Sequence, residues 1–152
     1  MGMALVEGLA ALHAVDHVAA GLADFGKAEG FLVRQVARWR SQLNGYGELA
    51  SWPGADELGN VAGVAGWLDA NRPPGFTPGI LHGDFHLANV MYREDSPELA
   101  AIIDWELATI GDPLIDLGWL LATWPQEADG GMLDIAPWNG FPASAEPLQR
   151  DR

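Results

Sequence analysis

The chain has 152 residues, of which 49% are hydrophobic, so it is long enough to fold as one domain with a buried core. It contains no cysteine, which excludes disulfide bonds, thiolate nucleophiles and cysteine-ligated zinc. With 21 acidic and 8 basic residues the net charge is -13, and we therefore expect no nucleic-acid partner. The acidic balance would suit a cationic substrate, or it reflects only an acidic, soluble surface.

No segment predicts a membrane span or export. The longest apolar run, Leu117 to Trp124, is interrupted by Gly118 and Thr123 and is far too short to cross a bilayer. The first residues, "MGMALVEGLA", lack the basic start of a secretion signal. We therefore expect a cytoplasmic protein with no membrane partner.

The first half of the chain predicts three amphipathic helices. "ALVEGLAALHAVD" places leucines at steps of four and three, and "GFLVRQVARWRSQL" repeats this pattern. A third helix is expected within residues 56–71 and should stop at "NRPPG", because two prolines cannot continue it. The expected apolar stripes of the second and third helices are Leu32, Val36, Trp39 and Leu43, and Leu58, Val61, Ala65 and Leu68.

A short antiparallel hairpin is expected in the second half. "GILHGD" is a short apolar entry to a polar loop, and "NVMY" and "LAAIID" are strand candidates joined by the turn-rich "REDSPE". Asn89 begins the first of these strands and Asp104 ends the second. A hairpin would therefore bring both residues to the same open end.

A final helix is expected in "GDPLIDLGWLLATW". Asp112 can serve as its N-cap and Pro113 as its first helical residue. Residues 125–152 are rich in proline, glycine and acidic residues, so this tail is expected to be loop with little regular structure.

The polar residues at the hairpin mouth indicate phosphate chemistry. Asp84, in the stretch "LHGDFHLANV", lies just before the first strand, close to where Asn89 and Asp104 should meet. Two carboxylates and one amide oxygen form a hard, oxygen-rich set that suits Mg²⁺, which usually binds one or two protein carboxylates together with substrate phosphates. A zinc site would be expected to offer more nitrogen.

Three motifs in the order "HGDFHLANV", "IIDWE" and "GDPLIDLG" resemble the aminoglycoside phosphotransferase and choline kinase group, which has a protein-kinase-like fold. The "IDWE" motif occupies the place of the kinase Asp-Phe-Gly. The segment "IDWELATIGDPLIDLGWLL", with "LAALHAVD" upstream, is most similar to the phosphotransferase domains associated with acyl-CoA dehydrogenases. The resemblance covers residues 4–124.

This resemblance implies an α+β fold, namely the mainly helical large (C-terminal) lobe of a kinase, with the short antiparallel hairpin carrying the site. It implies that Asp84 is the catalytic aspartate, which accepts or orients the proton of a small-molecule hydroxyl. Asn89 and Asp104 would ligate Mg²⁺ that bridges the phosphates of ATP.

Two further residues are expected to support the site. By the resemblance, His82 orders the catalytic loop through hydrogen bonds. Asp116 should be largely buried on the last helix and should accept hydrogen bonds from the backbone of the catalytic loop. His86 is expected to be solvent-facing or capping, and Glu106 either reaches the metal or a cationic substrate or is a surface carboxylate.

Two departures from protein kinases predict a small-molecule kinase without phosphorylation control. Gly83 stands where many regulated kinases carry an arginine that pairs with a phosphorylated activation loop. Only seven residues separate Asp104 from Asp112, which is too few for a long activation segment.

A third departure concerns the nucleotide. Kinase-like enzymes bind ATP between two lobes, and the small lobe contributes a lysine to the phosphates. The only lysine here, Lys27, lies in a predicted loop. We therefore expect residues 1–152 to form a partial catalytic lobe with the small lobe absent, so that a separate N-terminal nucleotide-binding lobe becomes a candidate partner.

Two other functions remain open from the sequence alone. One is a metal-dependent phosphoesterase that uses His82, Asp84, His86 and Asp104 around a metal. The other is a non-catalytic binding module that keeps the kinase-like fold without turnover.

Overall fold

The computed structural model describes residues 2–124, and this part of the chain is α+β, as predicted. It divides into two compact units, one formed by residues 2–26 together with residues 78–124, and one formed by residues 27–77. In chain order the helices and strands are α1 (Gly2–His13), α2 (Phe31–Gly45), α3 (Val61–Ala70), β1 (Gly79–Leu81), β2 (Val90–Tyr92), β3 (Leu99–Ile102), β4 (Thr109–Gly111) and α4 (Leu114–Ala122).

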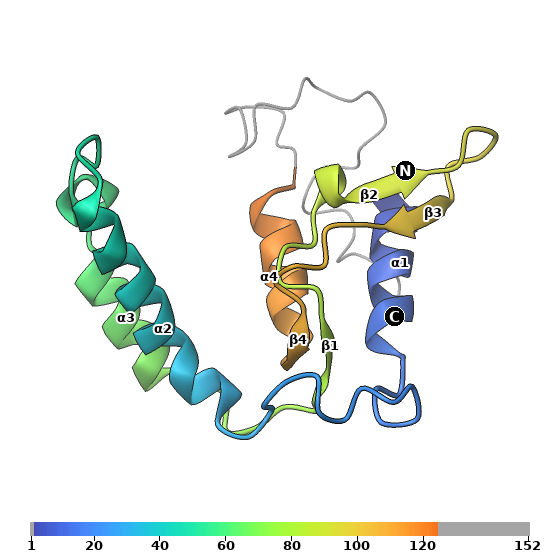
Figure 1. Cartoon of the computed structure of the whole chain (residues 1–152), viewed down its shortest axis with the longest axis horizontal. Helices are drawn as coiled ribbons and strands as arrows, with labels where there is room; N and C mark the ends of the chain where they lie inside the picture. Colours follow the sequence, from blue (N-terminus) through green and yellow to red (C-terminus); the bar gives the residue numbers. More distant parts are fainter. Residues whose placement is uncertain (1, 125–152) are drawn as a thin grey trace, which may run out of the picture. The chain divides into compact units, whose positions relative to one another are not determined.

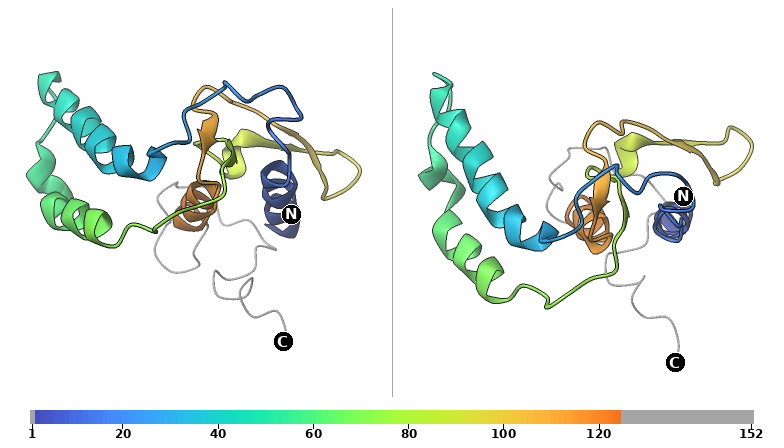
Figure 2. Two further views of the ribbon diagram at one scale, coloured as in Figure 1. Left: turned by 90° about the horizontal axis from the view of Figure 1, so that it is seen from below. Right: turned by 60° about the horizontal axis from the view of Figure 1, so that its bottom comes forward.

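The first unit contains two small antiparallel sheets. Strands β2 and β3 pair with Val90 opposite Ile102, which confirms the predicted hairpin. Strand β1 pairs with β4, with Ile80 opposite Ile110. The sequence did not predict β4, which is only three residues long. In Figures 1 and 2 the helices α1 and α4 lie on either side of β1.

The core of this unit joins its two helices, α1 and α4, to the loop before β2 and to the hairpin. It is formed by Leu5, Leu9, Phe85, Val90, Leu120 and Trp124, which are all buried. Each fully buried large apolar side chain stabilises the fold by about 1.5 to 3 kcal/mol. Because Phe85 is completely buried and follows Asp84 directly, the core anchors the loop that carries this aspartate.

Helix α4 begins one residue later than predicted. Pro113 precedes the helix, and the first helical residue is Leu114. Asp112 nevertheless caps the helix, because its carboxylate accepts a hydrogen bond from the backbone N–H of Leu114 at 3.1 Å. One-residue differences of this kind are usual where a helix begins.

The second unit is a pair of helices, α2 and α3, which run side by side in Figure 2. Asn60, the N-cap of α3, accepts a hydrogen bond from the backbone N–H of Gly63 at 2.8 Å. The predicted apolar stripes face each other, but they are not fully buried. Trp39 is 54% exposed and Leu68 is 47% exposed, whereas Ala65 is buried.

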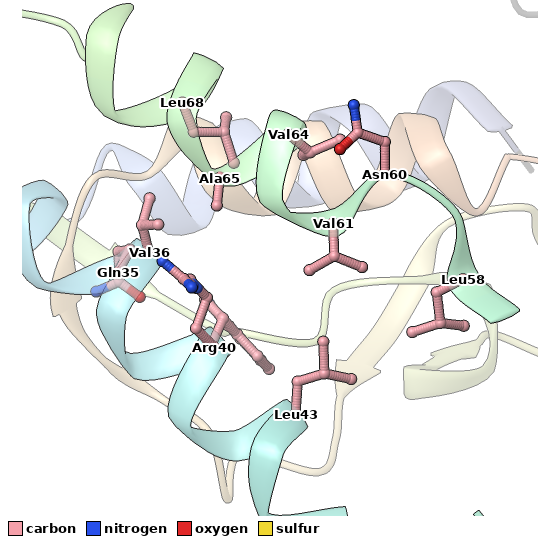
Figure 3. Close-up of a pocket in the computed structure, with 11 residues that line it drawn as sticks. Gln35, Val36, Arg40, Leu43, Leu58, Asn60, Val61, Val64, Ala65 and Leu68 are labelled. Carbon is pink, nitrogen blue, oxygen red and sulfur yellow. The ribbon is translucent and has the colours of Figure 1, made fainter. Parts of the chain in front are cut away.

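All of these stripe residues except Leu32 line an apolar groove of about 440 Å³ between α2 and α3 (Figure 3). The predicted amphipathic pattern is confirmed, because apolar side chains of both helices line this groove. The predicted loop over residues 125–152 lies outside the described residues. Among residues 2–124, no helix combines the length and the apolar character needed to cross a lipid bilayer.

Candidate active site

The carboxylate of Asp84 is surrounded by three side-chain donors. The indole Nε1 of Trp119 donates to Oδ1 at 2.7 Å, and the amide Nδ2 of Asn89 donates to Oδ2 at 3.0 Å. The Nε2 atom of His86 lies 3.4 Å from Oδ1. The side chain of Asp84 is 31% exposed, so a small molecule can still reach it.

Asn89 ties the loop of Asp84 to the hairpin. Its Nδ2 also donates to the backbone carbonyl of Asp84 at 2.9 Å, which closes the loop on itself. Its own carbonyl accepts a hydrogen bond from the backbone N–H of Ile103 at 2.9 Å, just beyond the paired residues of β2 and β3. Asn89 and Asp104 are therefore at the same end of the hairpin, as expected from the sequence.

Asp104 follows β3 in an unusual backbone conformation. Its φ of 65° is the only positive φ of a non-glycine residue in the part of the chain that the structure describes. Aspartate tolerates this left-handed region better than most residues, and such outliers cluster at functional sites. The residue is exposed, and no side chain within residues 2–124 pairs with its carboxylate.

His82 links the loop of Asp84 to the residue before Asp104. Its ring is fully buried, with Nε2 at 2.9 Å from the carbonyl oxygen of Ile103 and Nδ1 at 3.3 Å from the backbone nitrogen of Asp84. A carbonyl only accepts and a backbone N–H only donates, so the neutral ring carries its proton on Nε2. The ring also packs against Phe85 and Trp105, with centroids 5.9 Å and 4.8 Å away.

Asp116 fixes the backbone of the same loop. It is fully buried on α4, and its two carboxylate oxygens accept hydrogen bonds from the backbone N–H groups of His82, at 2.7 Å, and Gly83, at 2.8 Å. The ring of His13, at the end of α1, lies 3.3 Å from Oδ2. The buried carboxylate thus finds the donors that its burial requires.

Gly83 is required by the conformation of this loop. Its φ is 88°, and a Cβ atom at this position would lie 2.7 Å from the backbone oxygen of Leu107. Any larger side chain would strain the backbone and displace the segment that follows Asp104.

Two contacts of the site were missed in the sequence. No pattern in the sequence predicted the hydrogen bond from Trp119 to Asp84, and none marked His13 as a partner of Asp116. Both contacts join residues more than thirty positions apart, so no local pattern signals them. His86 does cap the short helical turn Leu87–Asn89, as one of the two expectations had it, but its side chain is only 12% exposed.

The four side chains of the phosphoesterase hypothesis do not form a metal site. In the described part of the chain, no group of three or more His, Asp or Glu side chains is arranged to hold a metal ion. Both ring nitrogens of His82 are already hydrogen-bonded, and His86 accepts a hydrogen bond from the backbone N–H of Ala88 through Nδ1. Glu106 is exposed and takes part in none of these contacts.

The sequence matches the model of the phosphotransferase enzyme family over residues 1–136, and the chain belongs to this family. The resemblance seen in the motifs is thereby confirmed.

Relatives of known sequence include two acyl-CoA dehydrogenase family members and one antibiotic phosphotransferase. The chain is 35% identical over 115 residues to acyl-CoA dehydrogenase family member 11 of Gallus gallus, which is 75% of this chain and 14% of that protein. It is 34% identical over 111 residues to family member 10 of Mus musculus, 73% of this chain and 10% of that protein. Viomycin phosphotransferase of Streptomyces vinaceus is 31% identical over 67 residues, 43% of this chain and 23% of that enzyme.

Two solved structures have a similar fold. A protein from Ralstonia eutropha assigned to the aminoglycoside phosphotransferases gives a TM-score of 0.62 at 34% identity, over 90% of this chain and 37% of that one. An aminoglycoside-3'-phosphotransferase of type VIII gives a TM-score of 0.56 at 22% identity, over 79% of this chain and 43% of that one. The chain thus spans less than half the length of each of these five proteins.

Proposed function

We propose that this chain contributes the catalytic aspartate and the metal ligands of a kinase that transfers the γ-phosphoryl group of ATP to a hydroxyl of a small molecule. The observation that carries the proposal is the meeting of Asp84, Asn89 and the start of the Asp104 segment at one end of the β2–β3 hairpin. Membership of the phosphotransferase family supports the reaction type.

Asp84 would act on the acceptor hydroxyl. In the balanced reaction, the acceptor oxygen bonds to the γ-phosphorus, the bond from that phosphorus to the β–γ bridging oxygen breaks, and ADP leaves. The hydroxyl proton passes to the Asp84 carboxylate. Such general-base assistance contributes about 10² to 10⁴ in rate, and positioning of the reactants contributes much of the rest.

The donor set at this end of the hairpin fits Mg²⁺. The Nδ2 atom of Asn89 is committed to Asp84, which leaves the amide oxygen as the atom that a metal would use. Asp104 offers an exposed carboxylate. Its positive φ is a strained backbone conformation of the kind that clusters at functional sites. Oxygen ligands of this kind are those that Mg²⁺ prefers, and the bound ion would neutralise charge on the nucleotide phosphates.

His82 and Asp116 would support the chemistry without taking part in it. Their hydrogen bonds fix the backbone on both sides of Gly83, directly before Asp84. Replacing either residue should therefore affect the stability of the loop as well as turnover.

The nucleotide would need contacts from outside residues 2–124. Lys27 is exposed in a loop between α1 and α2, and its carbonyl accepts a hydrogen bond from the Arg34 side chain. No strand surrounds it in the described part of the chain. Residues 2–124 would therefore form most of the large lobe of a cytoplasmic kinase, and the nucleotide-binding lobe would be formed by residues outside this range.

The experiment that tests the proposal is the binding of ATP with Mg²⁺ to the 152-residue chain, compared with an Asp104→Ala variant. Binding that requires both Mg²⁺ and Asp104 would support it. Hydrolysis of a phosphate ester without any nucleotide would instead favour a phosphoesterase.

A further inference from the structure

We infer that Trp119 is a positioning residue that sets the rotation of the Asp84 carboxylate, an inference that rests on the proposed function. Its indole N–H donates to Oδ1 at 2.7 Å, the shortest side-chain contact that this carboxylate makes. A hydrogen bond between an N–H and an ionised carboxylate is about twice as strong as one between neutral groups. The position of the indole therefore decides where Oδ1 lies.

Helix α4 fixes both the backbone and the side chain at this point of the loop. Asp116 and Trp119 are three residues apart on α4, so their side chains project from the same face. Asp116 holds the backbone N–H groups of His82 and Gly83, directly before Asp84. Trp119 holds the carboxylate of Asp84 itself. One helix thus determines the position of the backbone and the orientation of the catalytic group.

The donors are distributed unequally between the two carboxylate oxygens. His86 accepts a hydrogen bond from the backbone N–H of Ala88 through Nδ1, so its neutral ring carries the proton on Nε2, which faces Oδ1 at 3.4 Å. Oδ1 therefore faces two donors, Trp119 and His86, whereas among residues 2–124 Oδ2 accepts a hydrogen bond only from Asn89. Because an ionised carboxylate oxygen can accept two hydrogen bonds, Oδ2 keeps a free lone pair for the acceptor hydroxyl.

A second tryptophan, Trp105, gives a comparison for an indole N–H that only needs a hydrogen-bond acceptor. The Nε1 of Trp105 donates to the backbone carbonyl of Ile102 at 2.9 Å, the ordinary way for a tryptophan to satisfy its N–H. Trp105 is exposed, whereas Trp119 is partly buried and donates to the carboxylate on which the proposed chemistry depends. A role in packing alone would not require this choice of acceptor.

The contact is tested first by nuclear magnetic resonance on the ¹⁵N-labelled 152-residue chain. The indole signal of Trp119 is assigned by its loss in Trp119→Phe, which removes the N–H but keeps an aromatic ring. In Asp84→Asn the charge-assisted hydrogen bond is weakened, so the indole proton of Trp119 should move upfield by more than that of any other tryptophan. An indole proton that does not respond to Asp84→Asn would overturn the inference.

The positioning role is tested by release of phosphate from ATP with Mg²⁺, with water as the acceptor. Trp119→Phe should lower kcat by about 10- to 100-fold with KM changed by less than about twofold, because the ground-state binding groups are untouched. Trp67→Phe makes the same change on α3 at a side chain that is 64% exposed, and it should leave both constants unchanged. An unchanged kcat in Trp119→Phe, with a lowered kcat in Asp84→Asn, would overturn the inference and leave the proposed function standing.

The proposed function fails in a different pattern, namely full activity in Asp84→Asn, and the positioning role of Trp119 then fails with it. If the chain releases no phosphate, the nuclear magnetic resonance result decides whether the inference about Trp119 stands. An indole signal that depends on Asp84 supports the inference, and an indifferent one overturns it.

Discussion

The buried carboxylate of Asp116 accepts a hydrogen bond from the backbone N–H of His82 at 2.7 Å, across 34 residues of sequence. A second hydrogen bond, from the N–H of Gly83 at 2.8 Å, occupies its other oxygen. This pair of contacts joins α4 to the loop that carries Asp84. The geometry of the candidate site therefore depends on a residue that need not touch any substrate.

We predict that Asp116→Ala destabilises the chain by about 2 to 5 kcal/mol. The substitution leaves two backbone N–H groups without an acceptor, and each such buried group costs about 1 to 3 kcal/mol. Urea unfolding followed by circular dichroism measures the change. Asp95→Ala is the matched control, because that side chain is 72% exposed and should cost less than about 0.5 kcal/mol. An unchanged urea midpoint for Asp116→Ala would contradict the supporting role.

We predict opposite effects for two substitutions of glycine by alanine. Gly83→Ala should destabilise the chain by about 1 to 3 kcal/mol, since its φ is positive and the new Cβ would meet the backbone oxygen of Leu107 at 2.7 Å. Gly66→Ala, within α3 and with open space around the new Cβ, should stabilise it by about 0.5 to 1 kcal/mol. Thermal unfolding of both variants checks the pair, and equal midpoints would show that position 83 is not strained.

We predict that stability falls between pH 10 and pH 12 because of Tyr92. Burial raises the pKa of Tyr92 from 10.0 to about 12. Below pH 10 the phenol is neutral in both the folded and the unfolded state, so its contribution is fully present. As the pH rises toward 12 the unfolded chain loses this proton first, and folding loses about 1 to 2 kcal/mol, less than the full shift implies because the ring is only partly buried.

The matched variant for this pH effect is Tyr92→Phe, which keeps the ring and removes the ionisation. The difference in unfolding free energy between wild type and Tyr92→Phe should be constant up to pH 10 and should shift against the wild type above it. Unfolding curves that keep a constant separation from pH 8 to pH 12 would refute the assignment.

The helices and the hairpin could be predicted because their signals are local. The leucines of α1 recur at helical spacing, and Leu5 and Leu9 are indeed buried. The strands on both sides of "REDSPE" lie next to each other in sequence, so a hairpin was the simplest pairing. In contrast, β4 has only three residues and lies between two loops. It is a strand because it pairs with β1, and no local pattern predicts that pairing.

The site was predictable in its residue types but not in its contacts. The spacing around a hairpin was enough to predict that Asn89 lies close to Asp84 and that Asn89 and Asp104 lie at the same end of the hairpin. The hydrogen bond from Trp119 to Asp84 depends on how closely α4 approaches the loop of Asp84, and this distance is set by the packing of the core. The partial exposure of the apolar stripes on α2 and α3 could not be predicted either, because a periodic pattern shows which face of a helix is apolar but not which residues cover that face.

The central claim, that Asp104 and Asn89 hold Mg²⁺ together with ATP, is tested most directly by thermal unfolding of the 152-residue chain with both ligands. At a free concentration about 100 times the dissociation constant, a bound ligand stabilises the folded state by about 2.7 kcal/mol. We predict such a rise for the wild type and for Asp84→Asn, whose amide removes the base but not the proposed ligands, and its loss in Asp104→Ala. Equal stabilisation of the wild type and Asp104→Ala by ATP with Mg²⁺ would contradict the claim.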